Sequence, residues 1–149
     1  MSTNWPKPGL NHVPAYQQSA IPYVTRSITD ECGAHGGGAA NVVKVQFPFV
    51  TRFFTIKCPA GSTGNLRFGF TQLGVLGALG AHSTTSTNNN YFVVKKDTDT
   101  PRLELRCTEL FFVGDGLASG FEIVAGLTTI PASNMSGMLT GSNGFEGVG

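Results

Sequence analysis

The segment RLELRC (102–107) alternates strictly between apolar and charged side chains. A period of two places all the apolar side chains on one face of a β-strand and all the charged ones on the other. We therefore expect Leu103, Leu105 and Cys107 to point into a core. The residues between and before them, Arg102, Glu104 and Arg106, should point to solvent. A chain whose cleanest pattern has this period is directed toward β-structure rather than helices.

The same period recurs along the middle of the chain, between turns that are rich in Gly, Pro and Asn. The segments that carry it are 21–29, 42–47, 50–58, 65–70, 91–96, 109–116 and 120–130. Together with 102–107 they make about eight short strands. The glycines of 71–90 argue against a helix there, despite its leucines. We predict an all-β fold, an antiparallel β-sandwich of about eight strands, and this count is that of a single jelly roll.

The two ends of the chain lack this pattern. We expect an extended N-terminal arm (1–20), a jelly-roll-like sandwich domain (21–130) and a glycine-rich C-terminal arm (131–149). Apolar side chains in such arms cannot bury themselves, and ordering an arm on a neighbouring surface is a common route to assembly. The residues expected to make assembly contacts are Trp5, Val13, Tyr16, Leu139, Phe145 and Val148. The alternative is that the termini are flexible and these apolar residues incidental.

Composition limits the classes of partner. Charged residues make up 13% of the chain, about half of the usual ~25%, which suggests that much of the surface meets other protein. A net charge of +1 gives no overall field that would attract nucleic acid or lipid. The eight basic residues between Lys44 and Arg106, followed by four acids and no base from Glu109 onward, would let a basic patch meet a neighbour's acidic patch. Ordinary surface scatter is the alternative.

Three cysteines make an odd count, so we expect no disulfide framework and a reducing compartment. Cys58 and Cys107 end strand patterns and should be buried. The first residues, MSTNWPKPGLNHVP, lack the apolar stretch of a secretion signal, and no run approaches the ~18 apolar residues of a spanning helix. We expect no membrane insertion.

The stretch DECGAH (30–35) has the strongest resemblance to a chemical site. Cys32 and His35 have the spacing of half a zinc site, but no second closely spaced pair supplies the other two ligands. As a catalytic dyad they lack a third, orienting residue. The DTDT segment (97–100) with Asp115 would suit calcium, although paired Asp residues are also a common turn device.

Three further patterns are weak indications of function. Glu104 and Glu109 would be candidates for paired glycosidase carboxylates. Glu104, however, lies on the outward face between two arginines, so an ion-pair role explains it better. The glycine-rich segments 74–80 and 114–120 lack the Lys-Ser/Thr of a phosphate loop. A basic stripe for nucleic acid would consist of Arg52, Lys57, Arg67, Lys95, Lys96, Arg102 and Arg106. The aromatic residues between them should point into the core. We therefore expect no catalytic residue, cofactor, metal ion or specific nucleic-acid contact.

Several segments of the sequence resemble those of a known class of proteins. VVKVQFPFVTRFFTIK, NLRFGFT, NYFVV, LELRCTELFF, GFEIVAGLTTIP and LTGSNGFEGVG resemble segments of small β-sandwich proteins associated with virus capsids, particularly minor capsid or penton-type proteins of large double-stranded DNA viruses. The resemblance spans residues 20–149 and includes no short functional motif. It implies a non-enzymatic subunit of the virion, made in the host-cell cytoplasm, whose partners are copies of itself or the major capsid protein.

Two other functions stay open. The polar loop HSTTSTNNNY (82–91) has the Asn, Thr and aromatic side chains that suit sugar hydroxyls, so the alternative function is a carbohydrate- or receptor-binding module. The ordinary interpretation of that loop is a solvated surface turn. A hydrolase would have to use Cys32, His35 or Glu104.

Overall fold

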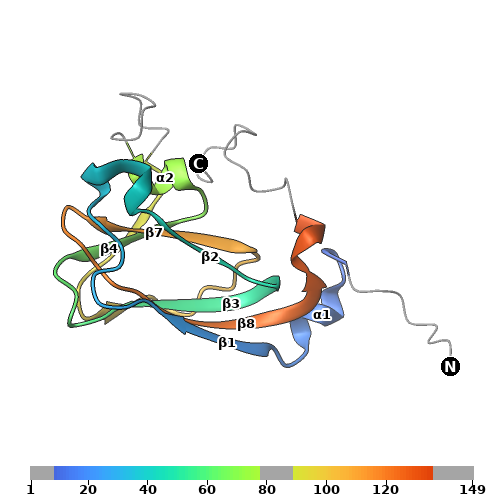
Figure 1. The fold of residues 1–149 in the computed structure, drawn as a ribbon. Helices are drawn as coiled ribbons and strands as arrows, with labels where there is room; N and C mark the ends of the chain where they lie inside the picture. Colours follow the sequence, from blue (N-terminus) through green and yellow to red (C-terminus); the bar gives the residue numbers. More distant parts are fainter. Residues whose placement is uncertain (1–8, 78–88, 136–149) are drawn as a thin grey trace, which may run out of the picture.

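Two four-stranded antiparallel sheets pack face to face in the computed structural model, which describes residues 9–77 and 89–135 (Figure 1). The first sheet has the order β1 (Ile21–Arg26), β8 (Glu122–Pro131), β3 (Phe49–Cys58), β6 (Thr98–Asp99). The second has the order β2 (Val43–Gln46), β7 (Glu109–Asp115), β4 (Asn65–Gly69), β5 (Phe92–Val94). These eight strands confirm the predicted all-β sandwich.

The chain crosses between the sheets at most of its connections. Only β4 and β5 are consecutive in the chain and also neighbours in a sheet. β1 and β8, the first and last strands, lie side by side, with Tyr23 opposite Ala125. The connections therefore tie the two sheets to each other along their whole width.

Aromatic pairs join the facing strands across the core. Phe54 of β3 meets Phe68 of β4 edge to face, with ring centroids 6.4 Å apart. Phe112 of β7 stacks on Phe121, just before β8, at 4.3 Å. Such pairs add to the free energy gained from burying apolar area. The inward residues that the alternation predicted correctly include Val45, Phe47, Phe54, Ile56, Cys58, Leu66, Phe68, Cys107, Phe121, Ile123, Ala125 and Leu127.

One predicted strand is absent. Segment 102–107 runs beside β3 but pairs with it only through an isolated bridge between Leu103 and Phe54 and one further backbone hydrogen bond, from the Thr51 N–H to the Cys107 carbonyl (3.0 Å). Leu105 is 42% exposed. Pro101 has no N–H to donate to a ladder. Further along, the Thr51 hydroxyl donates to the Leu105 carbonyl (2.7 Å) and accepts from the Cys107 N–H (2.9 Å). A side chain in β3 thus takes the place of regular backbone pairing, beside the register shifts between Phe49 and Phe53.

A short helix in segment 71–90 also differs from the prediction. α2 (Gln72–Leu76) begins at Thr71, whose hydroxyl accepts a hydrogen bond from the Gly74 N–H (3.0 Å), and it ends at Gly77 with φ of 69°. These are ordinary signals for starting and ending a helix. Val75 and Leu76 of α2 are buried with Phe111 and Val113 of β7. α2 and the 3-10 turn η1 (His35–Asn41) therefore cover the outer face of the second sheet.

The described part of the N-terminal segment is not fully extended as predicted. α1 (Val13–Gln17) has Pro14 in its first turn, where a missing N–H does no harm. Ala15 is buried with Val50, Ile130 and Met135, the last of which lies in the turn η4 (Ala132–Met135). Residues 9–20 and 131–135 thus pack together against one end of the sandwich (Figure 1).

Candidate functional site

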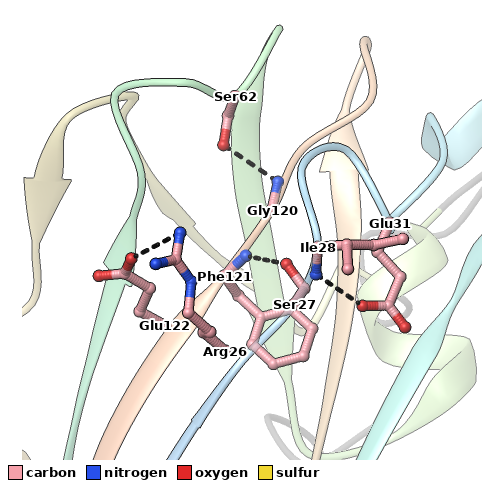
Figure 2. A network of polar contacts seen from close by, with 8 residues as sticks. All are labelled: Arg26, Ser27, Ile28, Glu31, Ser62, Gly120, Phe121 and Glu122. Carbon is pink, nitrogen blue, oxygen red and sulfur yellow. Dashed lines mark hydrogen bonds and ion pairs between the residues drawn. The ribbon is translucent and has the colours of Figure 1, made fainter.

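Three connections meet at the opposite end of the sandwich from α1. They are residues 27–33, 59–64 and 116–121, and we call their junction the loop end. Figure 2 shows the Ser27 hydroxyl accepting from the Phe121 N–H (2.8 Å) and the Ser62 hydroxyl accepting from the Gly120 N–H (3.0 Å). The Gly64 N–H also donates to the Ala118 carbonyl (2.8 Å). Hydrogen bonds between all three connections make this end a rigid surface.

Asp30 is held in the loop end by Thr63. Its carboxylate accepts from the Thr63 N–H (2.8 Å) and from the Thr63 hydroxyl (2.5 Å), and its backbone φ is 55°. The hydroxyl bond, followed by the backbone bond, lowers the pKa of Asp30 below its usual 3.8. The ionised carboxylate therefore stabilises the fold above pH 3.8, and this contribution is lost as the pH falls through the lowered pKa.

Asp30→Asn tests this arrangement. We expect a lower Tm than that of the unaltered chain at pH 7, and a difference that shrinks as the pH falls through the lowered pKa of Asp30, where the native carboxylate also becomes protonated. Thermal unfolding followed by circular dichroism over this pH range measures it. Thr63→Val, which removes the hydroxyl donor without changing any charge, should show the same trend. A Tm difference that does not shrink as the solution is acidified would contradict this role for Asp30.

Cys32 and His35 make separate contacts. Cys32 is fully buried and exchanges backbone hydrogen bonds with Ser119, and burial raises the pKa of its thiol to about 12. His35 Nδ1 accepts from the Gly116 N–H at 3.0 Å. The described residues contain no group of three or more His, Cys, Asp and Glu side chains that would hold a metal ion. Neither the zinc nor the dyad interpretation gains support from this geometry.

All three cysteines are buried and unpaired. Cys58 Sγ lies 3.4 Å from the Ser119 hydroxyl, at the end of β3, whereas Cys107 Sγ lies 3.4 Å from the Thr51 hydroxyl near its start. Burial raises the pKa of the Cys107 thiol to about 12. The predicted burial of Cys58 and Cys107 is confirmed, and the two thiols lie toward opposite ends of one strand.

Ion pairs account for the two candidate glycosidase carboxylates. Glu104 Oε1 lies 2.7 Å from Arg102 Nε, and Glu109 Oε2 lies 2.7 Å from Lys44 Nζ. These pairs belong to different parts of the sandwich: Glu104 follows β6, and Glu109 begins β7. The ion-pair interpretation of Glu104 is confirmed, and Glu109 also makes an ion pair.

Arg67 cannot contribute to a basic stripe on the surface, because its side chain is buried. Its side chain points to the outer face of the second sheet but is buried, between Leu76 of α2 and Tyr91. Its Nε donates to Asp115 Oδ1 at 2.7 Å, its guanidinium carbon lies 4.0 Å from the Tyr91 ring centroid, and its Nη1 reaches the Leu76 carbonyl at 3.5 Å. Arg67 therefore joins Asp115 of β7 to Leu76 and to Tyr91.

An apolar pocket of about 500 Å³ lies between β5, the edge strand of the second sheet, and the chain that follows β6, the edge strand of the first sheet. Phe68 and Phe92 meet there with ring centroids 5.7 Å apart, and Phe92 is 58% exposed. The lining residues are Phe68, Gly69, Phe70, Asn89, Asn90, Tyr91, Phe92, Thr100, Pro101, Leu103 and Leu105. Of the predicted polar loop 82–91, only Asn89 to Tyr91 fall within the described residues, and all three line this pocket.

The predicted assembly residues have mixed positions. Val13 is exposed on α1, whereas Tyr16 is partly buried, donates to the Leu10 carbonyl (2.9 Å) and lies under the guanidinium of Arg106. Both therefore belong to the packed end of the sandwich. The other four, Trp5, Leu139, Phe145 and Val148, lie outside the described residues.

The most exposed apolar pair was missed by the sequence pattern. Val24 and Val124 lie directly opposite each other in β1 and β8, on the outer face of the first sheet, and are 73% and 53% exposed. Next to them, Arg26 pairs with Glu122 at 3.4 Å (Figure 2). The sequence gave no indication of this exposed pair, because Val24 and Val124 are far apart in the chain and only the pairing of β1 with β8 brings them together.

Searches against family models, curated proteins and solved structures find no match to this chain. Among the described residues, no helix is long and apolar enough to cross a membrane. The fold, the loop end, the pocket and the outer face of the first sheet therefore carry the functional argument.

Proposed function

We propose that this chain is a non-enzymatic structural subunit of a viral capsid, a minor capsid, vertex or cement protein that assembles through its sandwich faces and terminal segments. The observation that carries the proposal is the strand order. A sheet of order β1-β8-β3-β6 packed on one of order β2-β7-β4-β5 supports the expected single jelly roll, an architecture that capsid subunits and lectins use.

The surface and the loop end support the same proposal. Shell stability comes from many repeated contacts between rigid bodies, and the loop end is braced by hydrogen bonds among three connections. The outer face of the first sheet exposes Val24 and Val124, and the whole chain carries few charges. The partners would be copies of this chain or a major capsid protein, and its location would be the virion after synthesis in the host-cell cytoplasm.

Comparing the full chain with residues 9–135 tests assembly through the terminal segments. The shorter chain keeps every described residue, including Tyr16 and Met135, which pack on the sandwich. We expect the full chain to form oligomers or particles, seen by sedimentation velocity and negative-stain electron microscopy, and the shorter chain to assemble less extensively. Two chains that remain identical monomers at all concentrations would contradict self-assembly through these segments.

A carbohydrate- or receptor-binding module is the second candidate. Lectins share the jelly-roll order, and Asn89, Asn90 and Tyr91 line the pocket beside the exposed ring of Phe92. The pocket lining is mainly apolar and one face of Tyr91 is taken by Arg67, which favours the structural proposal. A glycan array separates the two: specific binding that Phe92→Ala abolishes would favour the module, and an array without hits at high protein concentration would count against it.

A further inference from the structure

Four charged residues form one straight row across the outer face of the first sheet. The register places Arg26 of β1 opposite Glu122 of β8, Glu122 opposite Lys57 of β3, and Lys57 opposite Asp99 of β6. Residues directly opposite each other in a sheet point to the same face. Arg26, Lys57 and Asp99 are exposed, and the Glu122 side chain is 34% exposed. Across the sheet the row therefore has the charges plus, minus, plus, minus.

Read in the reverse order, this row carries the opposite charge at every position, so a reversed second copy of the row is complementary to it. When two copies pack these faces together about a two-fold axis parallel to the strands, strand order is reversed from one copy to the other. Arg26 then faces Asp99 of the second copy, and Glu122 faces its Lys57. The same symmetry generates both remaining pairs, so all four contacts join opposite charges. An axis perpendicular to the strands, along the row, would instead place each residue against its own like-charged copy.

We propose that the outer face of the first sheet binds a second copy of this chain about a two-fold axis parallel to its strands. Complementary charge sets this orientation, and the exposed pair of Val24 and Val124 beside the row supplies apolar area. The row has no net charge, so a strongly acidic or basic partner would find no attraction there. The second sheet does not offer an equivalent face, since α2 and η1 lie over it (Figure 1).

Two double variants test the pairing, because each preserves the net charge of the row and the opposite signs of the pair that it inverts. Within one chain, positions 122 and 57 then carry the same sign in both variants. R26E/E122R inverts the ion pair of β1 and β8. The new acid at position 26 would then face Asp99 of a second copy, and the new base at position 122 would face its Lys57. K57E/D99K inverts the other half of the row, with the same clashes. We expect each variant alone to self-associate at least ~10-fold more weakly than the unaltered chain, since facing like charges are costly.

A mixture of the two variants should restore association. All four facing pairs are then opposite in charge. Positions 26 and 122 of one variant face positions 99 and 57 of the other, and positions 57 and 99 of the first face positions 122 and 26 of the second. Sedimentation velocity of full-length chains carrying distinguishable labels measures both experiments, at low salt and again at about 1 M salt, where charges are screened beyond ~3 Å. The control is K44E/E109K, which inverts an ion pair of the second sheet and should associate like the unaltered chain. Circular-dichroism melts confirm that all variants fold.

The inference rests on the proposed function, because it names one contact of that assembly. If each variant associates with itself as well as the unaltered chain does, this contact is wrong while assembly through other surfaces stands. If neither variant nor their mixture associates although the control does, the charge pairing is wrong. An unaltered full-length chain that stays monomeric under all these conditions overturns both the contact and self-assembly. Recovery confined to the mixture is the result that supports the proposal.

Discussion

Gly114→Ala should lower the free energy of unfolding by about 3 kcal/mol, the upper end for overpacking a core, which corresponds to a Tm roughly 10 °C lower for a chain of this size. Gly114 lies near the end of β7, where the alternation points it inward like Phe112. The chain turns back sharply at Gly116, with φ of 81°, and brings the Leu117 carbonyl oxygen to within 1.9 Å of the place that a Cβ would occupy.

The obstacle at Gly114 is backbone, which cannot rotate away as the tip of a side chain can. Moving it would disturb the loop end, since the Gly114 N–H donates to the Gly33 carbonyl (2.9 Å) and Ala118 accepts from Gly64. Gly61→Ala is the matched control, because an added Cβ there meets no atom within 4 Å. It should leave stability unchanged or raise it by up to ~1 kcal/mol through the unfolded state. Equal, small effects at both glycines in urea unfolding would show that the turn at Gly116 is not constrained as described.

The strands were largely predictable because burial on one face imposes a period of two. Phe54, Ile56 and Cys58 of β3 follow that rule, as do Ile123 and Ala125 of β8. The helix α2 was not predictable in this way, since five residues are too few to show a period of 3.6. It is stable because Val75 and Leu76 pack on β7, a contact between distant parts of the chain.

Segment 102–107 is the opposite case: its strict alternation predicted a strand, and the structure has none there. The pattern records which side chains face inward, and Cys107 does so. Whether a ladder forms depends on the neighbouring strand, and here the Thr51 hydroxyl occupies the Leu105 carbonyl and the Cys107 N–H. Alternation alone cannot reveal which partner a backbone group finds.

The candidate surfaces could not be derived from the sequence because they depend on register. Arg26, Lys57, Asp99 and Glu122 come from four strands, and only the pairings β1–β8, β8–β3 and β3–β6 bring them into line. The separation of basic and acidic segments noticed along the chain suggested a basic patch meeting an acidic one. The structure instead mixes the two signs in this row, which changes the expected partner surface from two patches to one self-complementary face.

Arg67→Ala should cost about 3 kcal/mol of stability, as expected when one partner of a largely buried ion pair is removed. Only 10% of the Arg67 side chain is exposed, and 28% of that of Asp115. The change would leave the Asp115 carboxylate without its 2.7 Å donor and would uncover the Tyr91 ring. Urea unfolding of R67A, D115A and the double variant measures this, and the double variant should cost clearly less than the sum of the two single changes.

Arg102→Ala provides the comparison that isolates burial. Arg102 also has a carboxylate oxygen 2.7 Å from its Nε, on Glu104, and a ring centroid 4.0 Å from its guanidinium carbon, on Phe53. Its ion pair is exposed, however, at 51% and 59% of the two side chains, and exposed pairs contribute at most ~1 kcal/mol. The two arginines make the same kinds of contact. If R67A loses more free energy of unfolding than R102A, the difference measures how much the exclusion of water strengthens these contacts. Equal losses would mean that α2 and Tyr91 do not shield Arg67 from water in solution.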